Sequence, residues 1–427
     1  MATADRLEQP QRPKFVRILG PGLITGASDD DPSGIATYSQ AGAQFGYGLG
    51  WSLVATFPLM AAIQEISARI GRVTGRGIAG NLARHYPPWL VNVTVALLIL
   101  ANTINIGADL GAMGASLQLL IGGPSLPYVV GFALLSVLLE IFVSYARYVS
   151  VLKYLTLSLF AYVATVFVVG TPWHEVLVNL VLPPFQLSKD YILTITAVLG
   201  TTISPYLFFW QAEEEVEDEQ ETPGELPLVV SPHEAPRQLY RIRIDTVVGM
   251  AFSNLVALFI VATTAATLHA HGHTDIQTSA EAAEALRPLA GPFAFALFAC
   301  GIIGTGLLAL PVLAGSAAYA LGEAIGWRVG LAQKAGRAPA FYAAIALATL
   351  IGAVIALSPV EPVKALFWSA VINGVVAVPL MIIMMLMTRR RDIMGQFVLP
   401  RYLAILGWIS TLAMAGTVIA LGVLTFL

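Results

Sequence analysis

Two long apolar segments of this chain are each interrupted by a proline with polar residues around it. The first break reads Asp29-Asp30-Asp31-Pro32-Ser33-Gly34, and the second reads Thr201-Thr202-Ile203-Ser204-Pro205-Tyr206. In hydrocarbon every backbone N–H and C=O needs a partner, so a spanning helix is broken only where protein or a water-filled site satisfies the freed groups. Two breaks in corresponding halves of a chain are typical of a midplane binding site formed by discontinuous helices.

The composition places the chain in a membrane. Hydrophobic residues make up 57% of the 427 residues and charged residues only 11%, whereas soluble domains carry about 25% charged residues. The single cysteine, Cys300, excludes a disulfide framework and a cysteine metal site. The stretch up to Phe15 is polar and has no apolar core, so we predict a cytoplasmic tail over residues 1–19 rather than a signal peptide.

Counting about 20 apolar residues per span predicts eleven transmembrane helices, of which the first and sixth contain the breaks. They cover residues 20–42, 48–70, 89–121, 126–147, 151–171, 190–212, 243–268, 292–322, 339–358, 363–388 and 402–426.

Basic residues are distributed unevenly among the loops between these helices. If the N-terminus is cytoplasmic, the outside loops hold only Lys189, Arg287 and Lys364 of the 23 lysines and arginines. Cytoplasmic loops are enriched in Lys and Arg, so the pattern predicts a multi-pass protein of the inner or plasma membrane. An odd number of spans puts the C-terminus outside the cell.

Ten of the eleven helices divide into two sets of five, each beginning with a broken helix. We therefore expect an all-α fold with a five-plus-five inverted repeat, over residues 20–171 and 190–388, and an extra terminal helix over 402–427. Residues 213–242, between the first two helices of the second repeat, are predicted to form an acidic cytoplasmic loop. It is either a solvated extension of the sixth helix with a linker, or a vestibule that concentrates cations at the cytoplasmic mouth.

Among the residues of the two breaks, Asp31 is the strongest candidate for a functional role. An ionised aspartate at bilayer depth costs several kcal/mol unless it faces a cavity or a cation, although Asp is also a good cap for the helix that starts at Pro32. The second break adds the hydroxyls of Thr201 and Ser204, and both breaks free carbonyl oxygens. Hard cations such as Mg²⁺ and Mn²⁺ favour oxygen ligands. The sequence therefore predicts a divalent-cation site with Asp31 as the charged ligand.

The third helix carries a second intramembrane acid, Asp109. With Asn102 and Asn105 it falls at helical positions i, i+3 and i+7, along one stripe. The stripe either faces the cation and its waters or forms helix–helix hydrogen bonds. We favour the second interpretation for the two asparagines and leave both open for Asp109.

The first helix resembles that of the Nramp divalent-metal transporters. The resemblance rests on Gly20-Pro21-Gly22, on Asp31-Pro32-Ser33-Gly34-Ile35-Ala36-Thr37, and on the stretch from Gln40 to Tyr47. It implies a LeuT-like fold with Asp31 as a metal ligand. It also makes Asn373, in the tenth helix, a candidate ligand, because relatives offer an amide to the metal in that region.

Departures from the family pattern carry the finer inference. Gly34 stands where manganese and iron transporters of the family have an asparagine, Ser204 where they have a methionine, and Tyr206 where they have a histidine. Loss of the thioether removes the soft ligand, and Gly34 leaves room for an ion that keeps its waters, as Mg²⁺ does. This set of replacements resembles the Nramp-related magnesium transporter subgroup.

The proton relay of the coupled relatives is interrupted in this sequence. Ala112 stands where those relatives have a glutamate three residues after the acid of the third helix, and none of the six histidines falls inside a predicted span. We therefore expect import of Mg²⁺, and also of Mn²⁺, driven by the membrane potential without coupled protons.

Two alternatives stay open: a proton-coupled Mn²⁺ or Fe²⁺ transporter, and an amino-acid type carrier of organic substrates on the same scaffold. The sequence shows no motif for nucleotide binding, nucleophilic catalysis or nucleic-acid recognition, so we predict neither an enzyme nor a nucleic-acid-binding protein. The expected partners are the metal ion as substrate and the lipid bilayer, with no cofactor and no obligatory protein partner.

Overall fold

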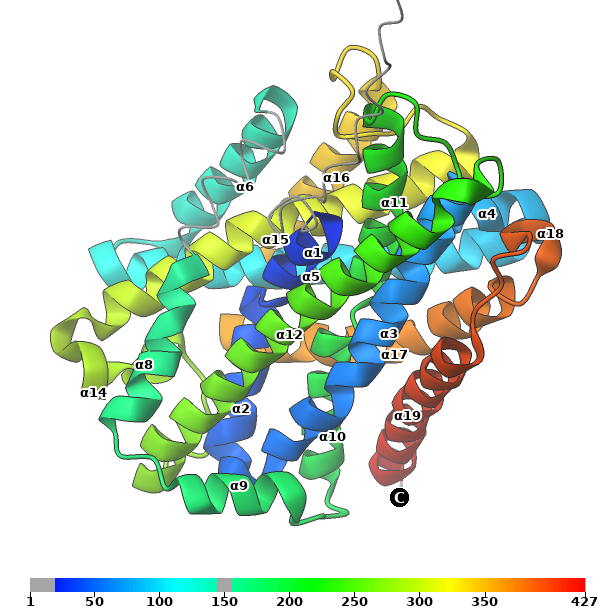
Figure 1. Cartoon of the computed structure of the whole chain (residues 1–427). Helices are drawn as coiled ribbons and strands as arrows, with labels where there is room; N and C mark the ends of the chain where they lie inside the picture. Colours follow the sequence, from blue (N-terminus) through cyan, green and yellow to red (C-terminus); the bar gives the residue numbers. More distant parts are fainter. Residues whose placement is uncertain (1–19, 144–155, 427) are drawn as a thin grey trace, which may run out of the picture.

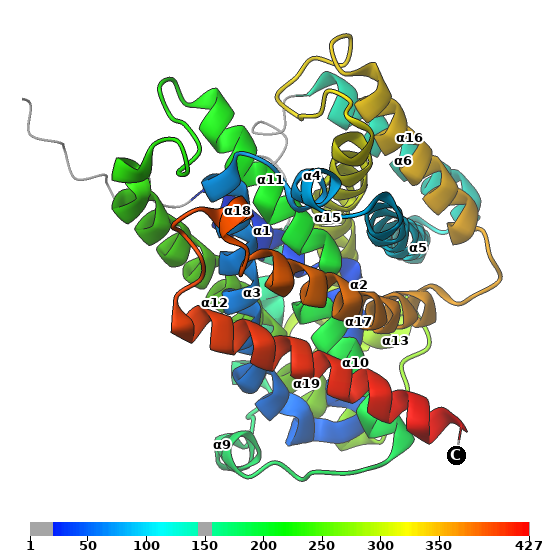
Figure 2. The same ribbon diagram turned by 90° about the vertical axis from the view of Figure 1, so that its right-hand side faces the viewer.

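The computed structural model describes residues 20–143 and 156–426, and within these ranges every regular element is a helix (Figures 1 and 2). The predicted tail over residues 1–19 lies outside the described residues. We call the two ends of the molecule the α4 end and the α9 end, after the helices that lie there in Figure 1.

Both predicted breaks are confirmed. Helix α1 (Pro21–Asp29) ends where the aspartates begin and α2 (Pro32–Phe45) follows, while α10 (Lys189–Thr202) is separated from α11 (Pro205–Glu221) by two residues. Pro32 and Pro205 each occupy the first position of the second half-helix. Proline is well suited there, because the first turn of a helix has no acceptor for its N–H and needs the φ that proline fixes.

The remaining helices surround these two pairs. The long ones are α3 (Gly50–Thr74), α5 (Pro88–Ile121), α6 (Ser125–Phe142), α12 (Ala235–Thr267), α15 (Ala294–Ile325), α16 (Pro339–Ala356), α17 (Pro362–Met387) and α19 (Arg401–Phe426). The short ones are α4 (Ile78–His85), α8 (Phe160–Val168), α9 (Trp173–Val181), α13 (Ser279–Glu284), α14 (Arg287–Ala290) and α18 (Arg391–Met394).

The predicted number of eleven spans is not confirmed. Nine helices among the described residues are long and apolar enough to cross a membrane, or ten if the pair bent by 111° at α8 and α9 is one span. One of the nine, Pro32–Thr74, comprises both α2 and α3, between which the chain reverses its direction (Figure 1). At 1.5 Å per residue its 43 residues cover about twice the hydrocarbon thickness. Residues 144–155, which would begin the fifth predicted span, lie outside the described part.

The predicted loop over 213–242 is helical at both ends, because α11 continues to Glu221 and α12 already begins at Ala235. The extension of the sixth helix, one of the two interpretations, is therefore present. It is only partly solvated, because Glu213, Glu215 and Glu219 are buried while Glu221 is exposed.

Glycines allow each of the two broken helices to pack closely against a neighbouring helix. A β-carbon on Gly26 of α1 would overlap the backbone of Gly249 in α12. Likewise, a β-carbon on Gly200 of α10 would overlap the backbone of α17 at Ala370 and Gly374. Small residues permit this close approach of backbones in membrane helices.

Candidate metal site between the broken helices

Asp31 lies in the first break, and its side chain is only 1% exposed. Its Oδ1 accepts hydrogen bonds from the Ser33 hydroxyl and from the Gly34 backbone N–H, both at 2.7 Å. Asp31 is therefore the cap of α2, as one of the two sequence interpretations expects.

The other carboxylate oxygen connects α2 to two more helices. Oδ2 of Asp31 accepts from the Asn105 side-chain amide of α5 at 3.0 Å and from the Tyr206 hydroxyl of α11 at 3.2 Å. A cap alone would use one oxygen and local donors. The contacts to Asn105 and Tyr206 place the carboxylate where both broken helices and α5 meet.

The second break faces the first across Gly34. A β-carbon on Gly34 would lie 3.2 Å from the Thr201 hydroxyl and 3.3 Å from the Asp29 carbonyl oxygen. The predicted residues Asp31, Gly34 and Thr201 are thus brought together. Ser204 lies in the same break, and its hydroxyl is 2.8 Å from both the Gly200 and the Thr201 carbonyl oxygens, so it donates to one of them at a time.

Asp109 and Asn373 are buried polar residues whose side chains have no hydrogen-bond partner within the described residues. Asp109 lies one helical turn after Asn105, and both of its carboxylate oxygens lack a donor. Asn373 immediately precedes Gly374, which packs against Gly200 beside the second break. A buried polar group without a hydrogen bond lowers the stability of the fold. We therefore expect an ion or a water molecule to bind each of these side chains.

The other two aspartates of the first break are held differently. The Ser253 hydroxyl of α12 lies 2.5 Å from Oδ2 of Asp29 and 3.2 Å from Oδ1 of Asp30. These carboxylates therefore face α12, whereas Asp31 faces α5 and α11.

The predictions for the asparagines of α5 and for Tyr206 can be compared with their hydrogen bonds in the structure. The Asn102 amide donates to the Leu313 carbonyl oxygen and the Ser316 hydroxyl of α15, so the expected helix–helix bond is confirmed. The Asn105 amide of α5 also bonds across helices, to Asp31 at the cap of α2, so here the interhelical bond ends on the predicted charged ligand itself. The sequence identifies Tyr206 only as the residue that replaces a histidine and does not predict its bond to Asp31. The available signal was its position directly after Pro205, in the first turn of a half-helix that faces the other break.

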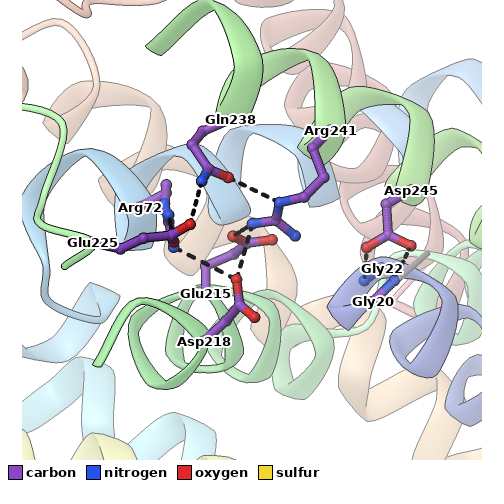
Figure 3. A network of polar contacts seen from close by, with 9 residues as sticks. All are labelled: Gly20, Gly22, Arg72, Glu215, Asp218, Glu225, Gln238, Arg241 and Asp245. Carbon is purple, nitrogen blue, oxygen red and sulfur yellow. Dashed lines mark hydrogen bonds and ion pairs between the residues drawn. The ribbon is translucent and has the colours of Figure 1, made fainter. Parts of the chain in front are cut away.

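Beyond the site, an ionic cluster joins three helices at the α4 end (Figure 3). Arg72 of α3 is fully buried and pairs with Glu225 and, at 3.5 Å, with Asp218. Arg241 of α12 pairs with Glu215 and, at 3.4 Å, with the same Asp218. The cluster therefore holds the extended end of α11 between α3 and α12.

Next to this cluster, Asp245 of α12 binds the beginning of α1 (Figure 3). Its two carboxylate oxygens accept from the backbone N–H groups of Gly20, at 2.9 Å, and Gly22, at 2.7 Å. The first N–H groups of a helix have no partner within the helix, and a carboxylate there is also favoured by the helix dipole. Asp245 thus fixes the α4 end of the first half-helix.

At the opposite end lies a cavity of about 420 Å³ between α2 and α10, whose lining stops short of Asp31 and Thr201. Its wall includes Asp190, Thr194, Gln40 and Asp275, and it reaches Ala36 of α2. Below it, Ile276 packs near Ala36 and Ala112. Gln40 of α2 binds the loop that contains residues 274–276. Its side chain accepts from the Ile276 N–H at 2.9 Å and donates to the Thr274 carbonyl oxygen at 3.1 Å.

A multi-pass helical protein with two discontinuous helices that meet at a buried carboxylate has the architecture of secondary transporters. The family model of natural resistance-associated macrophage protein-like (Nramp) proteins matches residues 22–424, so this chain belongs to the Nramp family.

Individual relatives and solved structures agree with this assignment. The chain is 25% identical to the divalent metal cation transporter MntH of Klebsiella pneumoniae over 95% of both chains, and 26% identical to MntH of Deinococcus radiodurans over 93% of this chain and 87% of that protein. A mutant of the Eremococcus coleocola manganese transporter matches with a TM-score of 0.74 at 17% identity, over 96% of this chain and 88% of that one. Mhp1, a nucleobase-cation-symport-1 family transporter, matches with a TM-score of 0.55 at 12% identity, over 94% and 92%. These likenesses to solved structures establish the shared fold.

Proposed function

We propose that this protein is a divalent-cation transporter that imports Mg²⁺ and also Mn²⁺ through the site at Asp31. The observation that carries the proposal is a buried carboxylate bonded at once to the α5 and α11 helices and to the first turn of α2. Membership of the Nramp family and relatives named as divalent metal cation transporters support it. The magnesium-related subgroup within the family is part of the proposal.

The residues at the two breaks supply only oxygen. In the proposal Asp31 provides the negative charge, freed carbonyl oxygens of the breaks provide direct contacts, and the hydroxyls of Thr201 and Ser204 bind the ion or its waters. The space predicted at Gly34 is not open in this state, because the Thr201 hydroxyl and the Asp29 carbonyl oxygen lie 3.2 and 3.3 Å from its β-carbon position. In the proposal Asp109 and Asn373 serve as further acceptors or donors for the waters of the ion. The described residues contain no group of three His, Cys, Asp or Glu side chains arranged to hold a metal. A site in which one carboxylate binds the ion, neutral oxygens complete the contacts and Asp109 acts only through water suits an ion that keeps part of its hydration shell.

The energy for import comes from the membrane potential in this proposal. An inside-negative potential contributes about 2.3 kcal/mol per charge per 100 mV, and therefore about twice that for a divalent ion. Within the described spans, the side chains that donate to Asp31 from other helices belong to Asn105 and Tyr206, and the sixth-helix histidine of coupled relatives is absent from the sequence.

Proteoliposomes test the proposal directly. We expect uptake of Mg²⁺ and Mn²⁺ that increases with an inside-negative potential, while a pH dye inside the vesicles reports no metal-dependent acidification. Acidification in step with uptake would instead support the proton-coupled Mn²⁺ or Fe²⁺ alternative. Accumulation of amino acids without divalent ions would support the organic-substrate alternative, which we do not favour because Asp31 would repel a substrate carboxylate.

The proposed topology places the α4 end in the cytoplasm, with the N-terminus inside and the C-terminus outside. The first and sixth helices with their partners would then rock against the remaining scaffold. The cavity near Gln40 is the outer approach, and the contacts of Asp245 and the ionic cluster close the inner one. In this state the inner end of α1 is fixed to α12.

The contact of Asp245 with the beginning of α1 can be tested by removing the carboxylate. Asp245→Ala removes the acceptor of two α1 N–H groups, and bonds to a charged group contribute about 1.5–3 kcal/mol. We expect the α1 amides to exchange with deuterium at least about tenfold faster, since about 1.4 kcal/mol corresponds to a factor of ten. Asp190→Ala at the opposite end should leave α1 exchange unchanged. Equal α1 exchange in the Asp245 variant and the unaltered protein would contradict the role of Asp245.

A further inference from the structure

The Tyr206 hydroxyl lies within reach of two acceptors on the first broken helix. It is 3.2 Å from Oδ2 of Asp31 and 3.4 Å from the carbonyl oxygen of Ser28. A hydroxyl has a single hydrogen, so it donates to one of them at a time. Tyr206 is only 1% exposed, so no bulk water competes for that hydrogen.

When Tyr206 donates to Asp31, the carboxylate has no free acceptor position. Ser33 and Gly34 donate to Oδ1, and Asn105 and Tyr206 donate to Oδ2. The two oxygens of a carboxylate together offer about four lone-pair sites. A cation therefore binds Asp31 directly only after one of the four donors withdraws.

Tyr206 is the donor best placed to withdraw. The Gly34 N–H is fixed in the first turn of α2, and Ser33 lies in the same turn. Within the described residues the Asn105 amide has Asp31 as its acceptor and no other, whereas Tyr206 also reaches the Ser28 carbonyl. The Ser28 carbonyl lies in the last turn of α1, which ends at Asp29, and the last carbonyls of a helix have no N–H partner within it. Rotation of the Tyr206 hydroxyl toward Ser28 would satisfy that carbonyl and open Oδ2 without moving a helix.

From these contacts we infer that Tyr206 is a specificity-determining residue, an inference that rests on the proposed divalent-cation transport. Its hydroxyl competes with the metal for Oδ2 of Asp31. An ion that keeps its waters, such as Mg²⁺, reaches the carboxylate through a water and tolerates this competition. An ion that loses water readily, such as Mn²⁺, gains most from a free Oδ2. Tyr206 therefore lowers the preference of the site for Mn²⁺ over Mg²⁺.

The test is Tyr206→Phe in the full-length reconstituted protein, with the dissociation constants of Mn²⁺ and Mg²⁺ measured by titration calorimetry. We expect the ratio of Mn²⁺ to Mg²⁺ affinity to rise at least threefold. A smaller rise, or a fall, would overturn the inference. Tyr162→Phe is the matched control, because Tyr162 is similarly buried and is not among the four donors to Asp31. Its affinity ratio should equal that of the unaltered protein.

A second variant separates competition from loss of structure. Asn105→Ala removes the other donor to Oδ2, so it should move the affinity ratio in the same direction, whereas general damage would weaken both ions alike and count against the inference. This variant also decides the question if Tyr206→Phe does not fold. Absence of divalent-cation binding in the unaltered protein would refute the proposed function itself. Binding in the unaltered protein with a constant ratio in the variants would refute only the role of Tyr206.

Discussion

Asp31→Ala should abolish the uptake of Mg²⁺ and Mn²⁺, with a loss of at least about 100-fold. Asp31 is the charge at the meeting point of α2, α5 and α11. Unit charges about 4 Å apart interact by about 4 kcal/mol at an effective dielectric constant of 20, and part of this is offset by the cost of removing water from the ion. A net loss of about 2.8 kcal/mol would correspond to the 100-fold decrease.

Folding has to be controlled in this experiment, because alanine leaves four donors without their acceptor. Asp31→Asn keeps the shape and most of these bonds but removes the charge, and it should lose transport as well. Asp392→Asn, a change to an exposed aspartate between α17 and α19, should transport normally. Undiminished uptake by a monodisperse Asp31→Ala protein would refute the assignment of Asp31.

The breaks and the charged residue between them could be predicted from the sequence, because the rules that govern them are local. A proline removes a backbone donor, and at Pro32 and Pro205 polar neighbours accompany the loss and the helix breaks. Pro58, Pro311 and Pro379 have apolar neighbours and lie inside α3, α15 and α17. Pro32 and Pro205 begin new helices as predicted, and Asp31 caps the first of them. The order of the helices follows equally from hydropathy.

The partners of these residues could not be predicted, because they depend on how distant helices are rotated. Asn102 and Asn105 lie on the same stripe of α5, yet one binds α15 and the other binds Asp31. The acidic end of α11 has the composition of a solvated surface, but the buried Arg72 and the nearby Arg241 draw it into a cluster. A hydropathy profile treats each charged residue by itself and contains no information on ion pairs between residues of different helices.

The contact between α1 and α12 provides the second prediction with a large effect. Gly26→Val should destabilise the protein by about 3 kcal/mol or more, at or above the upper end of the 1–3 kcal/mol typical of overpacking. The reason is that a β-carbon at Gly26 would overlap three backbone atoms of Gly249. A backbone cannot rotate away as a side chain can, so α1 would have to move off α12.

That movement should also reduce transport in the molecules that still fold, because α1 ends at Asp29, directly before the site, and its Ser28 carbonyl lies beside Tyr206. Thermal unfolding of the purified protein followed by size-exclusion chromatography measures the first effect, and Mn²⁺ uptake per folded molecule measures the second. Gly131→Val in α6 is the control, since a β-carbon there meets nothing within 4 Å. If the Gly26 and Gly131 variants unfold at the same temperature, the packing of α1 on α12 is looser than the structure indicates. If the Gly26 variant is destabilised but transports at the normal rate per molecule, the position of α1 does not govern the site.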